Sequence, residues 1–274
     1  MCTHAPLRLE ADAQSPTVKI LTLSQPASLN AMTVEMGDAI EATVDRLRTL
    51  EAHEFRALVI TGAGRAFSAG GDLQFLEARR TDNPTANAIA MRKFYARFLS
   101  IRTLPVPVVC AINGPAIGAG LSFAMATDLR VTHDEAKLGF TFVGLGLHPG
   151  MGCTHTIAAA ASGQAASRML LTGDVISGKE AAVLGLVASS HPSPDAAQEE
   201  AMGIARRIAS QSPLAVRATV RTLRAASDAG LDAALQREAD AQAQSYASTD
   251  YAEGLAAITC KRKPTFGVQA AEEA

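Results

Sequence analysis

The sequence predicts an α/β fold, in which helices cover a buried sheet and a wholly helical segment follows. Three observations predict this class. Short apolar runs rich in β-branched residues are typical of strands buried on both faces, and two of them lead into glycine-rich turns. Amphipathic helical patterns separate these runs, which is the arrangement of βαβ units. Beyond Ser193 only helical patterns remain.

The first part of the chain alternates strand and helix. Thr17–Leu23 is predicted to be a strand, and a helix is predicted from Thr33 onward. In that helix the apolar residues recur every three or four positions, at Met36, Ile40, Val44, Leu47 and Leu50. A buried strand is expected at Ala57–Thr61 and a second helix from about Ala86 to Ile101.

The middle of the chain is organised around an apolar strand, Val106–Ile112. Residues 113–120 contain three glycines and a proline, which interrupt regular structure, and Leu121–Ala126 is predicted to be a packed helix. A short strand at Asp128–Thr132 and a strand with a turn at Lys137–Gly146 are expected next.

The last part of the chain is marked by helix caps. Ser177–Glu180 is a capping box that begins a short helix, which Gly185 closes. Ser193 and Ser212 each precede a proline at the first position of a helix. We place a boundary near Gln211, which divides the chain into an α/β core at 1–211 and a helical region at 212–274. One face of that region carries Leu231, Leu235 and Glu238 among alanines and is suited to packing against another element.

Two glycine-rich turns, over residues 61–73 and 112–128, are candidates for chemistry. A strand followed by such a turn and a helix directs backbone N–H groups at one point, where negative charge is stabilised. If the two turns converge, they present two donors to one oxygen. A dinucleotide-binding fingerprint is excluded, because Phe67 and Phe123 stand where G-x-G-x-x-G requires its third glycine.

Composition excludes several classes of function. The net charge of −2 gives no case for a nucleic acid or an anionic membrane surface as partner. The first fifteen residues contain no apolar signal segment, and no apolar run is long enough to span a bilayer, so we expect a cytoplasmic protein. The four cysteines form no C-x-x-C pair and are expected to be reduced thiols. No Cys/His cluster indicates a metal site.

Five segments, in order along the chain, carry a resemblance to a known family. They are GAGRAFSAGGDL, INGPAIGAGLSFAMATDLRV, LGLHPGMG, LTGDVISGKEAAVLGLV and EGLAAITCKRKPTF. Together they resemble the crotonase (enoyl-CoA hydratase/isomerase) family and span about Val18 to Phe266. The resemblance implies a spiral of ββα units and a helical C-terminal region that assembles trimers, which often pair into hexamers. It also implies an acyl-CoA thioester as substrate, with no permanently bound cofactor, and a place in fatty acid metabolism.

The resemblance assigns the two turns to an oxyanion hole. By position, the backbone N–H groups of Gly71 and Ala119 would hold the thioester oxygen and stabilise an enolate. The alternative is that both are tight turns between packed elements. The resemblance further assigns coenzyme A contacts to Asn30, Ala31 and the backbone of Ala69, Gly70, Gly71, Asp72 and Leu73. Lys261, with Arg262 and Lys263, is a candidate for the CoA phosphates or a charged helix end.

The sequence departs from the family where proton transfer is expected. Hydratases of the family use two glutamates, and Ser122 and Phe142 occupy those positions here. Some isomerases and dehalogenases use an aspartate where this chain has Gly150. Because acid–base groups contribute about 100- to 10,000-fold to rate, efficient hydration is not expected.

Other residues are candidates to replace these carboxylates. Ser122 lacks a base and is suited to packing on a helix, and His148 is a candidate base or a structural loop residue. Tyr95 lies on a helix that borders the acyl pocket in the family, but its spacing favours the core. Asp72 is expected to cap or orient local backbone.

Three hypotheses follow from these residues. The first is an acyl-CoA enzyme, a lyase or isomerase in class, that decarboxylates, isomerises or hydrolyses a thioester without the two glutamates. The second is a non-catalytic acyl-CoA-binding protein. The third is an ordinary enoyl-CoA hydratase whose acid and base are displaced.

Overall fold

The structure is a computed structural model that describes residues 5–267, and a six-stranded sheet forms its centre. The strand order is β1-β2-β3-β4-β6-β9; β1 is antiparallel to β2 and all other pairs are parallel. The strands are β1 (Leu7–Ala11), β2 (Val18–Leu23), β3 (Ala57–Gly62), β4 (Val108–Ile112), β6 (Leu129–His133) and β9 (Ser189–His191). A three-stranded sheet joins β5 (Ala116–Ile117), β7 (Lys137–Gly139) and β8 (Val175–Ser177) in the order β5-β7-β8.

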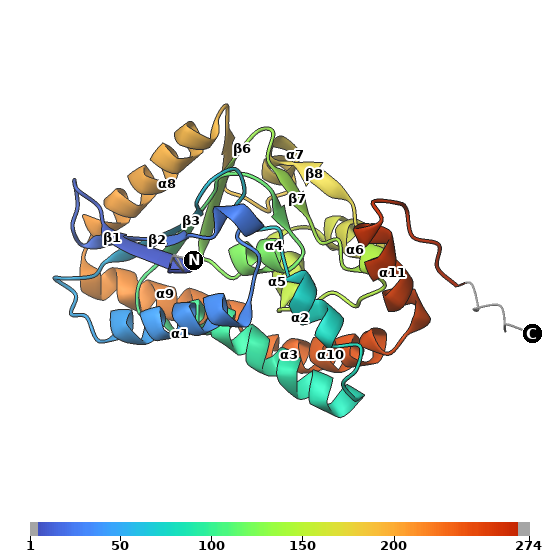
Figure 1. The fold of residues 1–274 in the computed structure, drawn as a ribbon. Helices are drawn as coiled ribbons and strands as arrows, with labels where there is room; N and C mark the ends of the chain where they lie inside the picture. Colours follow the sequence, from blue (N-terminus) through green and yellow to red (C-terminus); the bar gives the residue numbers. More distant parts are fainter. Residues whose placement is uncertain (1–4, 268–274) are drawn as a thin grey trace, which may run out of the picture.

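Strands β3 and β4 are buried at every position, and nearly all of their residues are apolar, because helices cover both faces of the sheet. In β3, Leu58 and Ile60 belong to the large core, whereas Val59 between them belongs to a second core beneath α8 (Pro194–Ala209). Successive side chains of a strand alternate between faces, so a strand covered on both sides needs apolar residues throughout. Figure 1 shows α8 on one side of the sheet and α1 (Val34–Arg48) on the other.

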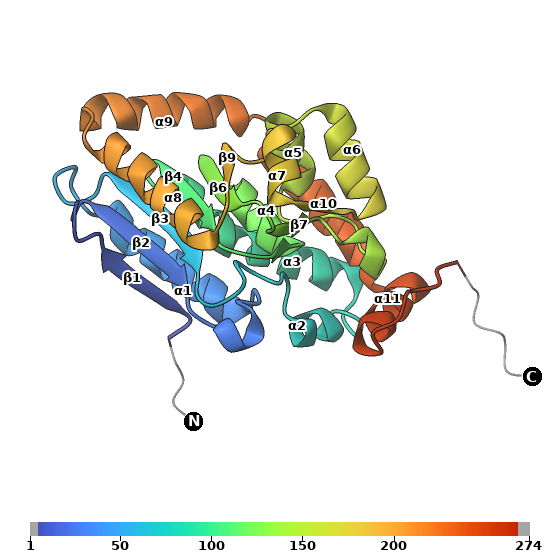
Figure 2. The ribbon, with the colours of Figure 1, turned by 90° about the horizontal axis from the view of Figure 1, so that it is seen from above.

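The remaining helices surround the second sheet and the far end of the molecule. They are α2 (Leu73–Ala78), α3 (Pro84–Leu99), α4 (Ala119–Met125), α5 (Cys153–Ala160), α6 (Gly163–Thr172), α7 (Gly178–Val183), α9 (Pro213–Ser227), α10 (Leu231–Tyr246) and α11 (Thr249–Thr259). Short 3-10 turns lie at η1 (Pro26–Ser28), η2 (Ser100–Thr103) and η3 (Val143–Leu145). Seen from above, α10 runs beside α3, and α11 lies at the edge of the molecule (Figure 2).

Most elements expected from the pattern are confirmed within a residue or two. The capping box at Ser177 and Glu180 is present, and Gly185 follows that helix with a φ of +80°. Helix α3 begins at Pro84 because Asn83 caps it through the N–H of Ala86. The sequence did not predict β1, β5, β8 or β9: three of these strands have two or three residues, and β1 is partly exposed at the sheet edge. Such strands carry too little periodicity to recognise.

The C-terminal helices pack against the rest of this chain. The apolar face of α10 lies on the turn at Gly152, where a Cβ would come 3.1 Å from Leu231 Cδ1 and 3.4 Å from Leu235 Cδ2. In α9, the buried Arg224 holds Asp128 with Nη2–Oδ2 at 2.6 Å and also donates to the carbonyl oxygens of Arg102, Leu104 and Val106. The division at Gln211 stays a prediction.

The helices and the cysteines can be compared with what the sequence predicts about membrane spans and thiols. No helix within residues 5–267 combines the length and apolar character that crossing a bilayer demands. Cys110, Cys153 and Cys260 are free thiols, whereas Cys2 lies outside the described residues.

Candidate active site

The two glycine-rich turns meet in space. The N–H of Ile117 donates to the carbonyl oxygen of Ser68 at 3.0 Å. Gly70 has a φ of +95°, and a Cβ on it would lie 2.6 Å from Ile117 O and 3.6 Å from Ala119 N. Only glycine allows this approach without strain. The expected convergence of the turns is therefore confirmed.

Each turn leaves one backbone donor without a protein partner. Gly71 pairs with Met32 as a parallel bridge whose hydrogen bonds run from Met32 N to Gly70 O at 2.8 Å and from Asp72 N to Met32 O at 3.3 Å. That pattern directs the N–H of Gly71 away from Met32. Ala119 is the first residue of α4, so its N–H has no partner within the helix. Within residues 5–267 neither N–H donates to the protein, and both residues line one cavity.

Side chains behind the first turn fix its shape. The amide of Asn30, fully buried, donates to the carbonyl oxygens of Ala63 and Ala66 at 3.0 and 2.9 Å. Ser68 Oγ donates to Asn30 O at 2.8 Å. Asn30 thus supports the turn, and neither it nor Ala31 is among the residues that line the cavity. Asp72 caps α2 through the N–H of Phe75 at 2.9 Å, as expected.

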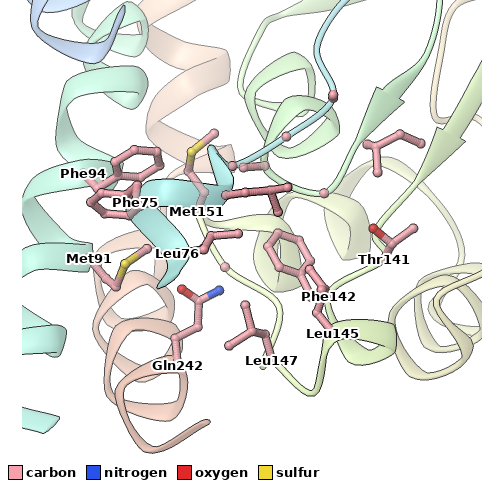
Figure 3. Close-up of a pocket in the computed structure, with 18 of the residues that line it drawn as sticks. Phe75, Leu76, Met91, Phe94, Thr141, Phe142, Leu145, Leu147, Met151 and Gln242 are labelled. Carbon is pink, nitrogen blue, oxygen red and sulfur yellow. The ribbon is translucent and has the colours of Figure 1, made fainter. Parts of the chain in front are cut away.

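The cavity beside the two donors measures about 140 Å³ and is mostly apolar. Figure 3 shows Phe75 and Phe94 on one side, where their rings stack with centroids 4.8 Å apart, and Phe142 on another. The polar side chains in the lining are Tyr95, Thr141, Gln242 and Tyr246. Among the described residues, no Asp, Glu, His, Lys, Arg or Cys belongs to the lining.

The three positions where the resemblance predicts carboxylates differ in what fills them. Ser122 is fully buried within α4, where its Oγ donates to Gly118 O at 3.0 Å, and it lies outside the cavity lining. Phe142 lines the cavity and closes it beside Gly118. At Gly150, a Cβ would lie 2.5 Å from both Gln242 Nε2 and Tyr95 Oη. Side chains from α10 and α3 thus occupy the space where an aspartate would stand.

Gln242 is a lining residue that the sequence did not single out. Its Oε1 accepts from Tyr95 Oη at 2.8 Å and its Nε2 donates to His148 O at 2.8 Å. Burial raises the pKa of Tyr95 well above its usual value, so this hydroxyl remains a neutral donor. A glutamine on a packed helix face gives no local signal, because its role depends on α3 and the 148–154 turn.

Glu238 supports the same turn from behind the cavity wall. Its Oε2 accepts from Gly152 N at 2.6 Å, and its Oε1 accepts from Thr154 N at 2.9 Å and Thr154 Oγ1 at 2.5 Å. Burial raises its pKa, while these donors oppose that rise. The sequence predicted Glu238 on the packing face of the helix. In the structure Glu238 also holds the turn at residues 152–154 through these hydrogen bonds.

Two further candidates lie away from the lining. The ring of His148 has Nδ1 2.6 Å from Pro149 O, and the residue is not part of the cavity wall. Lys261 is exposed after α11, whereas Arg262 next to it pairs with both oxygens of Glu253 at 2.5 and 2.6 Å. No cluster of three or more His, Cys, Asp and Glu suited to a metal ion occurs in the described part of the chain.

Comparison with known proteins decides the family. A sequence profile of the enoyl-CoA hydratase/isomerase family matches residues 13–269. The chain belongs to the crotonase superfamily. It is therefore a member of the enoyl-CoA hydratase/isomerase family, whose members process acyl-CoA, and the fold that the resemblance implied is confirmed.

Relatives of this chain differ in their reactions. It is 33% identical to the crotonyl-CoA hydratase of Syntrophomonas wolfei over 90% of this chain and 93% of that protein. It is 32% identical to the 1,2-epoxyphenylacetyl-CoA isomerase of Escherichia coli, over 91% of this chain and 94% of that protein. An enoyl-CoA hydratase structure from Mycobacterium avium matches with a TM-score of 0.82 at 30% identity, covering 96% of this chain and 99% of that one. Family membership alone thus leaves the reaction open.

Proposed function

We propose that this protein holds an acyl-CoA thioester oxygen at the N–H groups of Gly71 and Ala119 and forms the enolate by decarboxylation of a 2-carboxyacyl thioester. The carrying observation is the cavity lining, in which the only ionisable side chains among residues 5–267 are two buried tyrosines. Loss of CO2 leaves its electron pair on the α-carbon, so the enolate arises without a protein base. Two preorganised donors at the oxygen are the catalytic element that this reaction needs.

Other reactions of an enolate site fit the lining less well. Hydration and thioester hydrolysis need a base for the attacking water, and isomerisation needs one for a C–H proton. For these reactions an acid or base from elsewhere would have to take over from the two glutamates, whose positions Ser122 and Phe142 occupy. The nearby buried carboxylate of Glu238 is engaged by Gly152 and Thr154 and does not line the cavity.

The same lining favours a second candidate, an acyl-CoA-binding protein without turnover. It shares the oxyanion site and the apolar cavity with the first and differs only in whether the carbon chemistry proceeds. We further propose that the pantetheine chain passes the backbone of residues 69–73, four of which line the cavity, and that Lys261 faces the CoA phosphates. Assembly into trimers would cover the exposed Leu214 and Leu223 of α9.

One pair of assays distinguishes the proposed decarboxylase from the non-catalytic candidate. We expect crotonyl-CoA to bind, as measured by calorimetry. We expect its hydration rate to be at least about 100-fold lower than that of a hydratase with general acid–base groups. We expect malonyl-CoA to release CO2. Binding of both thioesters without turnover would favour the non-catalytic candidate. Efficient hydration of crotonyl-CoA would contradict the proposal, and failure of both to bind would contradict the thioester site.

A further inference from the structure

Gln242 brings an uncharged amide into the cavity at the point where the family can place a carboxylate. The side chain comes from α10 and is almost wholly buried. Figure 3 shows its amide pointing into the cavity, with the ring of Phe142 on the far side. Its Nε2 lies 2.5 Å from the position of a Cβ on Gly150, so the amide fills the space of a side chain at that position.

One N–H of this amide remains for a ligand. A glutamine amide carries two N–H donors. The carbonyl oxygen of His148 takes one of them at 2.8 Å. The amide oxygen is held by Tyr95 Oη at 2.8 Å, and Tyr246 Oη lies 3.5 Å from it. These contacts fix the rotation of the amide and leave the second N–H without an acceptor among the described residues.

The amide lines the same cavity as the two oxyanion donors. Gly71, Ala119, Gly150 and Gln242 all line the same cavity, whose volume is only about 140 Å³. With the thioester oxygen at Gly71 and Ala119, a substituent on the α-carbon has little room except toward the other walls. Of those walls, the one at Gly150 presents a donor held in place by two neighbours.

A neutral donor suits a carboxylate that must leave. A carboxylate in an apolar cavity is destabilised relative to water, and loss of CO2 relieves that cost because the negative charge moves to the thioester oxygen. An arginine or lysine in contact with the carboxylate would stabilise the substrate more than the transition state and would slow the step. An amide N–H orients the group with a smaller stabilisation of the substrate.

We propose that the free Nε2–H of Gln242 binds and orients the leaving carboxylate, which makes Gln242 the residue that selects 2-carboxyacyl thioesters. This inference rests on the proposed function. In the step, the bond between the α-carbon and the carboxylate breaks and CO2 leaves. The electron pair forms the enolate at Gly71 and Ala119, and a proton from water then adds to the α-carbon. Malonyl-CoA and one proton give acetyl-CoA and CO2.

The test compares malonyl-CoA with acetyl-CoA, which lacks only the carboxylate. In Gln242→Met, which keeps the side-chain length without donors, we expect malonyl-CoA binding to weaken about 10- to 100-fold and acetyl-CoA binding to change less than about threefold. Binding is measured as Kd, or as KM and kcat where CO2 is released. Gln242→Glu keeps an acceptor for Tyr95 but repels the carboxylate, so the selective loss should be at least as large. The control is Gln244→Met, an exposed residue on the same helix.

Each outcome decides a separate question. If Gln242 has a purely structural role, both Gln242 variants should bind malonyl-CoA and acetyl-CoA more weakly by the same factor, and that result overturns the inference. Selective loss without CO2 release by the unaltered protein keeps the inference and removes the proposed reaction.

Discussion

The two ends of the cavity are built in different ways. At one end, the donors are backbone N–H groups of Gly71 and Ala119, set by two turns whose contacts are themselves mostly backbone. At the other end, the wall is made by side chains from separate elements, with Gln242 from α10 and Tyr95 from α3 packed over Gly150.

This difference explains how one fold can keep a substrate and change a reaction. A backbone donor does not depend on the side chain of its residue, provided that the turn can form. A side-chain wall changes with a single substitution, and here Phe142 and Gln242 contribute side chains to that wall. The oxygen-binding end is therefore expected to define the class of substrate, and the opposite end the reaction.

The largest expected effect comes from removing one backbone donor. Ala119→Pro deletes the N–H at the first position of α4, where proline fits the helix. We expect CO2 release from malonyl-CoA to fall about 100- to 1,000-fold, as loss of one oxyanion donor does elsewhere. Ala119→Gly keeps the N–H and serves as the control. Equal rates for the two variants would show that this end does not hold the oxygen.

The second prediction concerns the support of the side-chain end. Glu238→Ala leaves the N–H groups of Gly152 and Thr154 without their acceptor inside the protein. We expect the free energy of unfolding to fall by about 2–5 kcal/mol, measured by denaturant titration. Asp240→Ala, at an exposed position on the same helix, should change it by less than about 0.5 kcal/mol. A loss no larger in Glu238→Ala than in that control would mean that the turn holds itself.

A third test rebuilds the side-chain end. Gly150→Asp places a Cβ 2.5 Å from Gln242 Nε2 and Tyr95 Oη, and we expect it to cost about 1–3 kcal/mol of stability through overpacking. Adding Gln242→Gly removes one of the two close contacts and should recover part of that loss. The two changes must therefore couple in a double-mutant cycle of thermal unfolding. Strict additivity would show that Gln242 does not occupy the space of the aspartate.

The smallest expected effect lies far from both ends, at the ion pair between Asp12 and Arg206. Hydrogen bonding to Arg206 lowers the pKa of Asp12, and the two side chains lie 2.7 Å apart at Oδ2 and Nε. A lowered pKa in the folded state adds stability above the unfolded pKa of about 3.9, and that stability is lost as pH falls through the folded pKa. We expect Asp12→Asn to lose about 1 kcal/mol at pH 7, because Arg206 is partly exposed. The difference in free energy of unfolding between the unaltered protein and Asp12→Asn should shrink below pH 4. A difference that does not change with pH would contradict this prediction.

The sequence predicted the elements that have strong local signals. Apolar strands such as β3 and β4, the capped helices and the two glycine turns were all recognisable, because periodicity, caps and glycine act within a few residues. That Ser122, Phe142 and Gly150 depart from the family pattern stays a prediction. Gln242 was not predicted, and Glu238 was predicted only as part of a packing face, since each acts on residues more than eighty positions away.

By itself, the sequence determined the kind of fold and the place of both glycine-rich turns, since these depend on residue type at fixed positions. It also predicted, through the resemblance, that family carboxylates are missing at Ser122, Phe142 and Gly150. Only the tertiary structure decided what fills the space beside Gly150. The close approach of α10 to α3 and to the 148–154 turn is set by packing of distant segments. That packing fills the space beside Gly150 with a neutral amide. In our proposal this amide decides whether the cavity accepts a substrate carboxylate.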